Sequence, residues 1–137
     1  MSPGRGKRIV GAFAALALLG AAAAAFAEYR ADQRDLRDRA EALTGGNVER
    51  GKRAFARYGC TGCHTASGVP QAQGKVGPPM TGIAGRAMIG GKLENKPANL
   101  RLWIENPQAV TPGTAMPDLD VAPADSRDIA AFLYTQT

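Results

Sequence analysis

The chain has 137 residues, of which 45% are hydrophobic and 21% charged, and its formal net charge is +5. This length suits one compact domain with an appendage rather than several domains. No run of Lys and Arg of the kind that grips a phosphate backbone occurs, which argues against nucleic-acid binding.

The N-terminal segment has the pattern of an export or anchoring sequence. Arg5, Lys7 and Arg8 precede an uncharged, Ala-rich run that extends from Ile9 to Ala27. A membrane-spanning helix needs about 20 apolar residues, whereas the core of a signal peptide needs roughly 7–15. We favour an uncleaved anchor over residues 1–27; a signal peptide cleaved after Ala25-Phe26-Ala27 stays open. Either interpretation puts the rest of the chain outside the cytoplasm, because basic residues stay inside.

Residues 28–45 are predicted to form a charged linker, mostly helical. Opposite charges recur at i,i+4 spacing, as in Arg37 and Glu41, which supports a solvated helix. Tyr29, Leu36 and Leu43 recur at heptad spacing and give this helix one weakly apolar edge. Thr44-Gly45-Gly46 then ends the helix, so a compact domain is expected over residues 46–137.

Three short helices are predicted in this domain. Asn47 is a suitable N-cap for a helix that ends near Tyr58. A second begins near Pro97 and ends at Asn106-Pro107, because the residue before proline avoids the helical region. A third begins at Pro123. Long Gly- and Pro-rich segments separate them, and no strand pattern of useful length occurs, so a bulky apolar group is needed to fill the middle.

The chemistry is carried by Cys60-Thr61-Gly62-Cys63-His64. Cys-x-x-Cys-His is the attachment signature of c-type haem: the two thiols add to the two vinyl groups of one porphyrin, and the adjacent imidazole lies under the iron. The chain has two Cys and one His in all, too few for a four-ligand zinc site. The strand–helix context of a thioredoxin-like pair is also missing. The sequence therefore predicts one covalently bound haem c.

A second axial ligand is expected from methionine, the usual partner of histidine in electron carriers. Met116 lies in the stiff turn Thr111–Pro117, far enough along the chain to fold over the opposite haem face. Met80 and Met88 are interpreted as core filler, the commoner role of methionine. The predicted iron ligands are thus His64 and Met116.

From Gly46 to Thr137 the chain resembles the small class I cytochromes c, in five segments in the same order. These are Gly46–Lys52, Gly77–Arg86, Trp103–Pro107, Pro112–Met116 and Asp128–Leu133. The resemblance implies an all-α fold in which three to four short helices and long loops surround one haem, with an N-terminal hydrophobic helix added in front.

The resemblance also implies roles for individual residues. The carbonyl of Pro78 would accept the Nδ1 proton of His64. Arg86 would compensate a haem propionate, with Thr114 hydrogen-bonding near it, and Trp103 would pack beside the haem close to Met116. Gly51 and Phe55 would meet Ile129 and Leu133 where the terminal helices cross. Met80 stands where leucine is usual, and the lysines that many mobile members use for docking are missing around Met116.

The resulting functional prediction is one-electron transfer between a respiratory donor, such as a quinol–cytochrome c reductase, and a terminal oxidase. We expect no enzymatic activity, catalytic residue or small-molecule substrate. The expected location is a bacterial inner membrane with the haem domain on the periplasmic side, or the soluble periplasm if the signal is cleaved. Two alternatives remain: a dedicated subunit of a larger oxidase or dehydrogenase, and a ligand-binding or peroxidatic haem protein.

Overall fold

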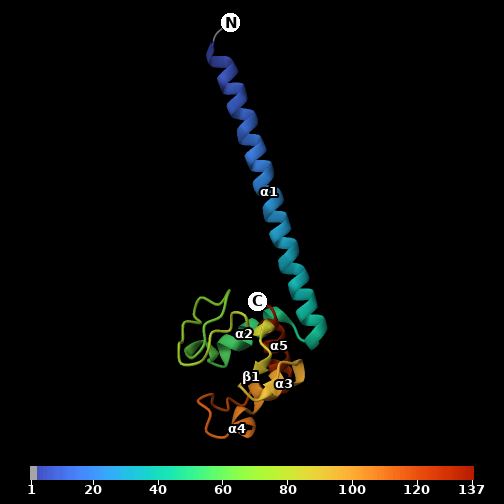
Figure 1. The fold of residues 1–137 in the computed structure, drawn as a ribbon, viewed down its shortest axis with the longest axis vertical. Coiled ribbons are helices and arrows are strands. Elements are labelled where there is room, and N and C mark those ends of the chain that lie inside the picture. The colour runs from blue at the N-terminus through green and yellow to red at the C-terminus, as the bar shows by residue number, and fades with distance from the viewer. Residues whose placement is uncertain (1–2) are drawn as a thin grey trace. The chain divides into compact units, whose positions relative to one another are not determined.

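The computed structural model describes the backbone of residues 3–137 and the side chains of residues 10–137. The side chains of Arg5, Lys7 and Arg8, predicted to flank the anchor, lie outside the described part. The chain divides into two compact units, residues 1–35 and residues 36–137. Helix α1, Pro3–Thr44, contributes to both units (Figure 1).

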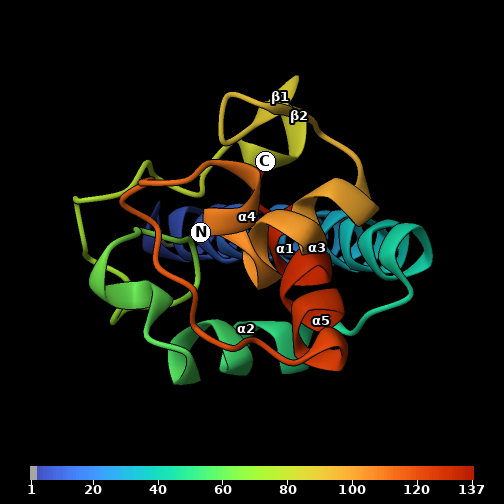
Figure 2. The ribbon, with the colours of Figure 1, turned by 90° about the horizontal axis from the view of Figure 1, so that it is seen from below.

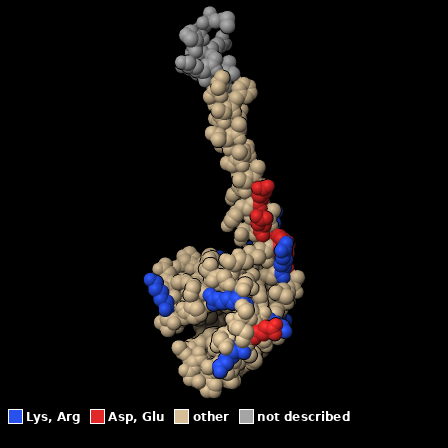
Figure 3. Space-filling view, in the orientation of Figure 1, with Lys and Arg blue, Asp and Glu red and all other residues tan. Residues whose placement is uncertain are grey.

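The first unit consists of the apolar part of α1 and the beginning of its charged part. Large apolar side chains such as Phe13, Leu19 and Phe26 are exposed all round the helix. In Figure 3 the described upper stretch of α1 shows no charged side chain on the drawn face, and charges begin lower down. Within the described residues this is one helix long and apolar enough to cross a membrane, although a signal sequence has the same properties.

The second unit is mostly helical, as predicted. Its principal helices are α2, Val48–Arg57; α3, Pro97–Glu105; and α5, Pro123–Tyr134. Asn47 caps α2 by accepting a hydrogen bond from the Arg50 N–H at 2.9 Å. Pro97 and Pro123 occupy first-turn positions, where the missing N–H costs nothing. All three predicted helix starts are therefore confirmed.

The core lies where α2 and α5 cross, with α3 alongside α5 (Figure 2). Phe55 and Phe132 meet edge to face at 5.6 Å between ring centroids. At Gly51 the helices come so close that an added Cβ would lie 1.8 Å from the carbonyl oxygen of Asp128. The expected crossing of the terminal helices is thus present, and glycine at position 51 makes it possible.

Several short elements were not predicted. Two single turns, η1 (Cys60–Gly62) and η2 (Ile83–Gly85), lie in the long loops, and α4 covers Pro107–Val110. Strands β1, Met88–Ile89, and β2, Leu93–Glu94, pair antiparallel with Ile89 opposite Leu93. Gly90 and Gly91 form the turn between them with φ of 55° and 70°, a conformation that favours glycine.

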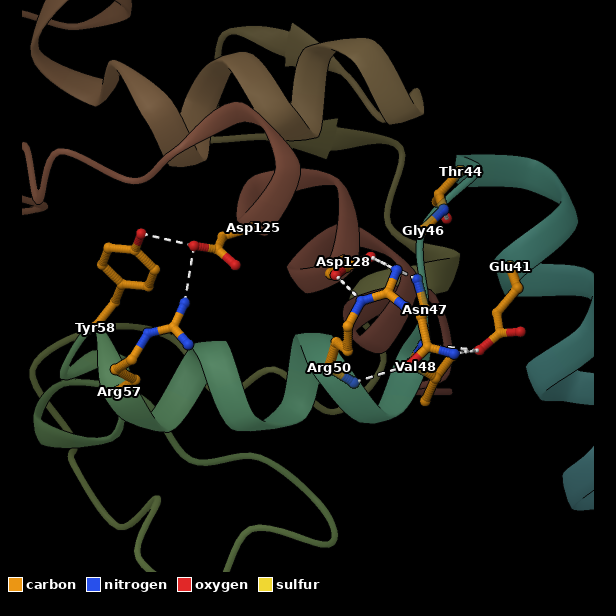
Figure 4. Close-up of polar contacts among 10 residues, drawn as sticks. All are labelled: Glu41, Thr44, Gly46, Asn47, Val48, Arg50, Arg57, Tyr58, Asp125 and Asp128. Atoms are coloured by element: carbon orange, nitrogen blue, oxygen red, sulfur yellow. Dashed lines mark hydrogen bonds and ion pairs between the residues drawn. The ribbon is translucent and has the colours of Figure 1, made fainter.

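The last turns of α1 belong to the second unit rather than to a free linker. Ala40 is buried in the core. Arg37 and Glu41, predicted to pair with each other, both bond to residues in the first turn of α2. Figure 4 shows the contact of Glu41. Arg37 pairs with Glu49 at 2.7 Å, and Glu41 accepts the Val48 N–H at 2.8 Å.

Candidate functional site

Both cysteines lie in the tight turn that follows α2. Tyr58 ends the helix, Gly59 adopts φ of 77°, and η1 brings the chain round so that the N–H groups of Cys63 and His64 both bond to the Cys60 carbonyl. The two thiols are free and half-buried. Burial raises the pKa of the unattached Cys60 thiol to about 11.

The His64 ring is held by the loop that faces it. Its Nδ1 lies 2.7 Å from the carbonyl oxygen of Pro78. A carbonyl can only accept, so Nδ1 carries the proton and the lone pair of a neutral ring is on Nε2. Gly77 packs directly on the imidazole, because an added Cβ would lie 2.3 Å from its Cε1. The ring is therefore fixed in both tautomer and orientation, as a metal-binding histidine requires.

Backbone bonds fasten this loop to the Cys-x-x-Cys-His turn. Gly77 N–H donates to the Cys63 carbonyl at 2.8 Å, and Met80 N–H donates to the Thr65 carbonyl at 2.8 Å. Gly74 leaves no room for a side chain, since a Cβ there would lie 2.2 Å from the Gly62 carbonyl oxygen. The turn and the loop consequently form one unit.

Met116 lies in the segment that follows α4. The Gln108 side chain of α4 donates to the carbonyls of Thr114 and Met116, at 2.8 and 2.7 Å, and accepts the Gly113 N–H at 3.0 Å. No pattern in the sequence indicates this role for Gln108, because a side chain that bonds backbone groups several residues ahead leaves no periodic signal.

These elements enclose one cavity of about 350 Å³, a size typical of cofactor sites. All eight residues predicted for the site line it: Cys60, Cys63, His64, Pro78, Arg86, Trp103, Thr114 and Met116. The remaining lining is almost entirely apolar, with contributions from α2, α3 and α5. Met80 and Met88, interpreted as core filler, also line it; Met80 is buried and Met88 is 46% exposed.

Arg86 and Trp103 lie on the cavity wall near the β1–β2 hairpin. The Arg86 guanidinium donates to the carbonyls of Pro79 and Thr81. Since a guanidinium group carries five N–H groups, Arg86 keeps further donors for a carboxylate at the cavity edge. The Trp103 ring lies against Gly90, where an added Cβ would be 2.7 Å from Cζ3. The hairpin turn thus determines which face the indole presents.

The side chains around the cavity suit a haem better than a bare metal ion. Two free thiols, one imidazole with an available Nε2 and nearby thioethers surround an apolar cavity. Among the residues that the structure describes, no group of three His, Cys, Asp or Glu could hold a bare metal ion. An iron here would need its own macrocycle to supply the equatorial ligands.

Comparison with known proteins identifies the family. The sequence model of the family described as Cytochrome c matches residues 48–137, which is most of the chain. The chain belongs to the cytochrome c family. Membership makes this protein an electron carrier rather than an enzyme, with covalently attached haem c as the group that carries the electron.

Two known proteins are similar to this cytochrome in sequence. Cytochrome c2 of Rhodomicrobium vannielii is 33% identical over 110 residues, covering 71% of this chain and 85% of the relative. Cytochrome c oxidase subunit 2 of Alkalihalophilus pseudofirmus is 34% identical over 87 residues. That alignment covers 63% of this chain and only 25% of the subunit, so this cytochrome spans about a quarter of it. No solved structure matched.

Proposed function

We propose that this cytochrome passes single electrons through one haem c, attached to Cys60 and Cys63 and ligated by His64 and Met116. The observation that carries the proposal is the cavity, to which the Cys-x-x-Cys-His turn and the Met116 segment both contribute. When bound, the haem supplies an iron that alternates between ferric and ferrous states.

The chain's own residues would tune that iron. Pro78 keeps the proton on Nδ1 of His64 and raises the basicity of Nε2. A thioether from Met116 favours the reduced ion and so raises the reduction potential. The apolar lining excludes water, and Arg86 supplies positive charge at the edge, with Thr114 and Trp103 completing the wall. Ligands that stay in place in both oxidation states suit transfer rather than catalysis.

Three matched variants test the ligation: Met116→Ala, Met88→Ala and Met80→Ala. All three methionines line the cavity, so each change removes one thioether from the cavity lining. We expect only Met116→Ala to lower the potential, abolish the far-red absorption of ferric iron bound to thioether, and open the ferrous protein to carbon monoxide. Wild-type spectra in Met116→Ala would contradict the assignment, and prompt carbon monoxide binding by the wild type would favour a ligand-binding haem protein.

We further infer three segments: an N-terminal anchor over residues 1–27, a charged connector over residues 28–45 and the haem domain over residues 46–137. The exposed apolar side chains of α1 support the anchor. The proposed location is a bacterial inner membrane, with the haem domain in the periplasm. A tether maintains a high effective concentration near membrane partners. The partners proposed are a quinol–cytochrome c reductase and a terminal oxidase.

A second candidate, a dedicated subunit of an oxidase, is favoured by the similarity to an oxidase subunit 2. The experiment is the intact mass of the haem protein from washed membranes and from the periplasmic fraction. Retention of Gly11–Ala27 in membranes supports the anchor, whereas a soluble form beginning at Glu28 contradicts it. Purification at a fixed ratio with one complex through detergent washes would indicate a subunit rather than a free carrier.

A further inference from the structure

The side chain of Gln108 binds the segment that carries Met116 at three points. Its Oε1 accepts the Gly113 N–H at 3.0 Å, and its Nε2 donates to the carbonyls of Thr114 and Met116 at 2.8 and 2.7 Å. Both Nε2 partners are carbonyl oxygens and the Oε1 partner is an N–H, so the amide has only one orientation that satisfies all three.

The backbone of Gln108 is itself held in place. Gln108 follows Pro107, which is fully buried at the start of α4, and its own N–H donates to the Asp118 carboxylate at 3.3 Å. One amide therefore joins α4 to Gly113, Thr114 and Met116 across a segment that contains two prolines and a glycine with φ of 82°. Such a segment makes few regular backbone bonds of its own, so side-chain bonds count for more.

We propose that Gln108 is a positioning residue: its amide holds the Met116 segment closed over the cavity and thereby limits how often the thioether leaves the iron. The inference rests on the proposed ligation by Met116. Residues 107–117 contain no lysine or histidine. Opening of the segment would therefore leave the iron accessible to a small external ligand rather than to a lysine or histidine of this segment.

The expected effect follows from the three bonds. Each neutral hydrogen bond contributes a severalfold factor to an equilibrium, so losing all three should raise the open population roughly ten- to hundredfold. An external ligand that binds only the open form gains apparent affinity by the same factor.

The test compares three variants of the full-length haem protein. Gln108→Leu keeps similar length and removes all three bonds. Gln108→Glu keeps an acceptor for Gly113 but turns a carboxylate oxygen toward the carbonyls of Thr114 and Met116. Gln73→Leu is the matched control, because Gln73 also donates to a backbone carbonyl, that of Pro70 at 3.0 Å, and does not line the cavity.

The measurements are imidazole binding to the ferric protein, hydrogen exchange of the Gly113 amide and the reduction potential. We expect Gln108→Leu to bind imidazole about ten- to hundredfold more tightly, Gln108→Glu to bind it more tightly than the wild type, and both variants to have a lower potential. Gly113 exchange should accelerate in Gln108→Leu, while Gln73→Leu stays at wild-type values. If Gln108→Leu does not fold, Gln108→Glu alone carries the comparison.

Three overturning outcomes can be told apart. If Met116→Ala removes the ferric–thioether absorption and neither Gln108 variant changes imidazole binding, the role of Gln108 is overturned and the ligation stands. If Met116→Ala leaves that absorption intact, the proposed ligation fails, and the positioning role fails with it. Equal effects in Gln108→Leu and Gln73→Leu would show general destabilisation and also overturn the inference.

Discussion

The backbone of Gly51 in α2 lies directly against the backbone of Asp128 in α5: an added Cβ would be 1.8 Å from the Asp128 carbonyl oxygen and 2.9 Å from the Ile129 nitrogen. The same carboxylate-bearing residue is bound from α2 by Arg50, whose Nε and Nη2 donate to the two oxygens at 2.6 and 2.9 Å (Figure 4). Close approach and a bidentate ion pair therefore act at one crossing point.

Replacing Gly51 with alanine should destabilise the domain by at least about 3 kcal/mol, the upper part of the range for overpacking. The opposing atoms are backbone and cannot move aside as a side chain could. Denaturant unfolding of the haem protein measures the loss. Gly85→Ala is the control, because an added Cβ there meets no atom within 4 Å. Equal stability of the two variants would contradict the packing argument.

The sequence predicted this crossing better than most features, because glycine within a helix is costly unless another helix comes close. Helix starts at Asn47, Pro97 and Pro123 were also predicted, since capping and first-turn proline are local signals. The short α4 was not, although Pro107 both ends α3 and begins α4. One proline can do both, because the N–H that it lacks is unpaired at a helix start anyway.

The contacts at the C-terminal end of α1 could not be predicted from residue spacing. The heptad spacing indicates only a weakly apolar edge, and Tyr29 and Leu43 on that edge are 59% and 56% exposed, whereas Ala40, which the heptad does not include, is buried. Next to Ala40, Glu41 accepts hydrogen bonds from the Val48 N–H and from Asn47 Nδ2 and so joins the end of α1 to the start of α2. These partners lie beyond a glycine turn, so no spacing rule within the helix could indicate them.

Glu41→Ala should therefore destabilise the haem domain by about 1 kcal/mol, the usual cost of losing a helix cap. The change leaves two donors at the start of α2 without their acceptor. The measurement is the thermal midpoint of the haem domain, followed by its Soret absorption. Glu28→Ala removes an exposed carboxylate from the same helix and should leave the midpoint unchanged. A shift of equal size in Glu28→Ala would count against the capping role.

The residues of the candidate site were predicted together, but the neighbouring residues that hold them in place were not. The motif and the resemblance together named eight of the residues that line the cavity. They did not reveal that Gly77 is the surface on which the imidazole rests, because that contact joins residues brought together only by the loop bonds.

Gly77→Ala should accordingly displace the His64 ring, since the new methyl would overlap Cε1, Nδ1 and Nε2. We expect a weakened Nδ1 bond to Pro78 and a lowered reduction potential, because a less basic and misaligned imidazole is a poorer ligand. Potentiometry and ferric absorption spectra check this. Gly62→Ala, between the two cysteines, has open space for its Cβ and is the control. An unchanged potential in Gly77→Ala would show that the loop yields.

The last prediction concerns acid stability at the helix crossing. Burial alone would raise the pKa of Asp128, but hydrogen bonds from Arg50 and from the Asn47 N–H outweigh it and hold the pKa below its usual value. A carboxylate with a depressed pKa in the folded state stabilises the fold above its unfolded pKa of about 3.9, and that contribution disappears as the pH falls through the folded pKa.

Asp128→Asn should thus be less stable than the wild type at pH 7, and the difference should shrink steadily below about pH 4. Denaturant midpoints measured across that range test the sign. Asp120→Asn, which removes a carboxylate at an exposed position, is the control. A constant difference between Asp128→Asn and wild type at all pH values would indicate lost packing rather than lost charge.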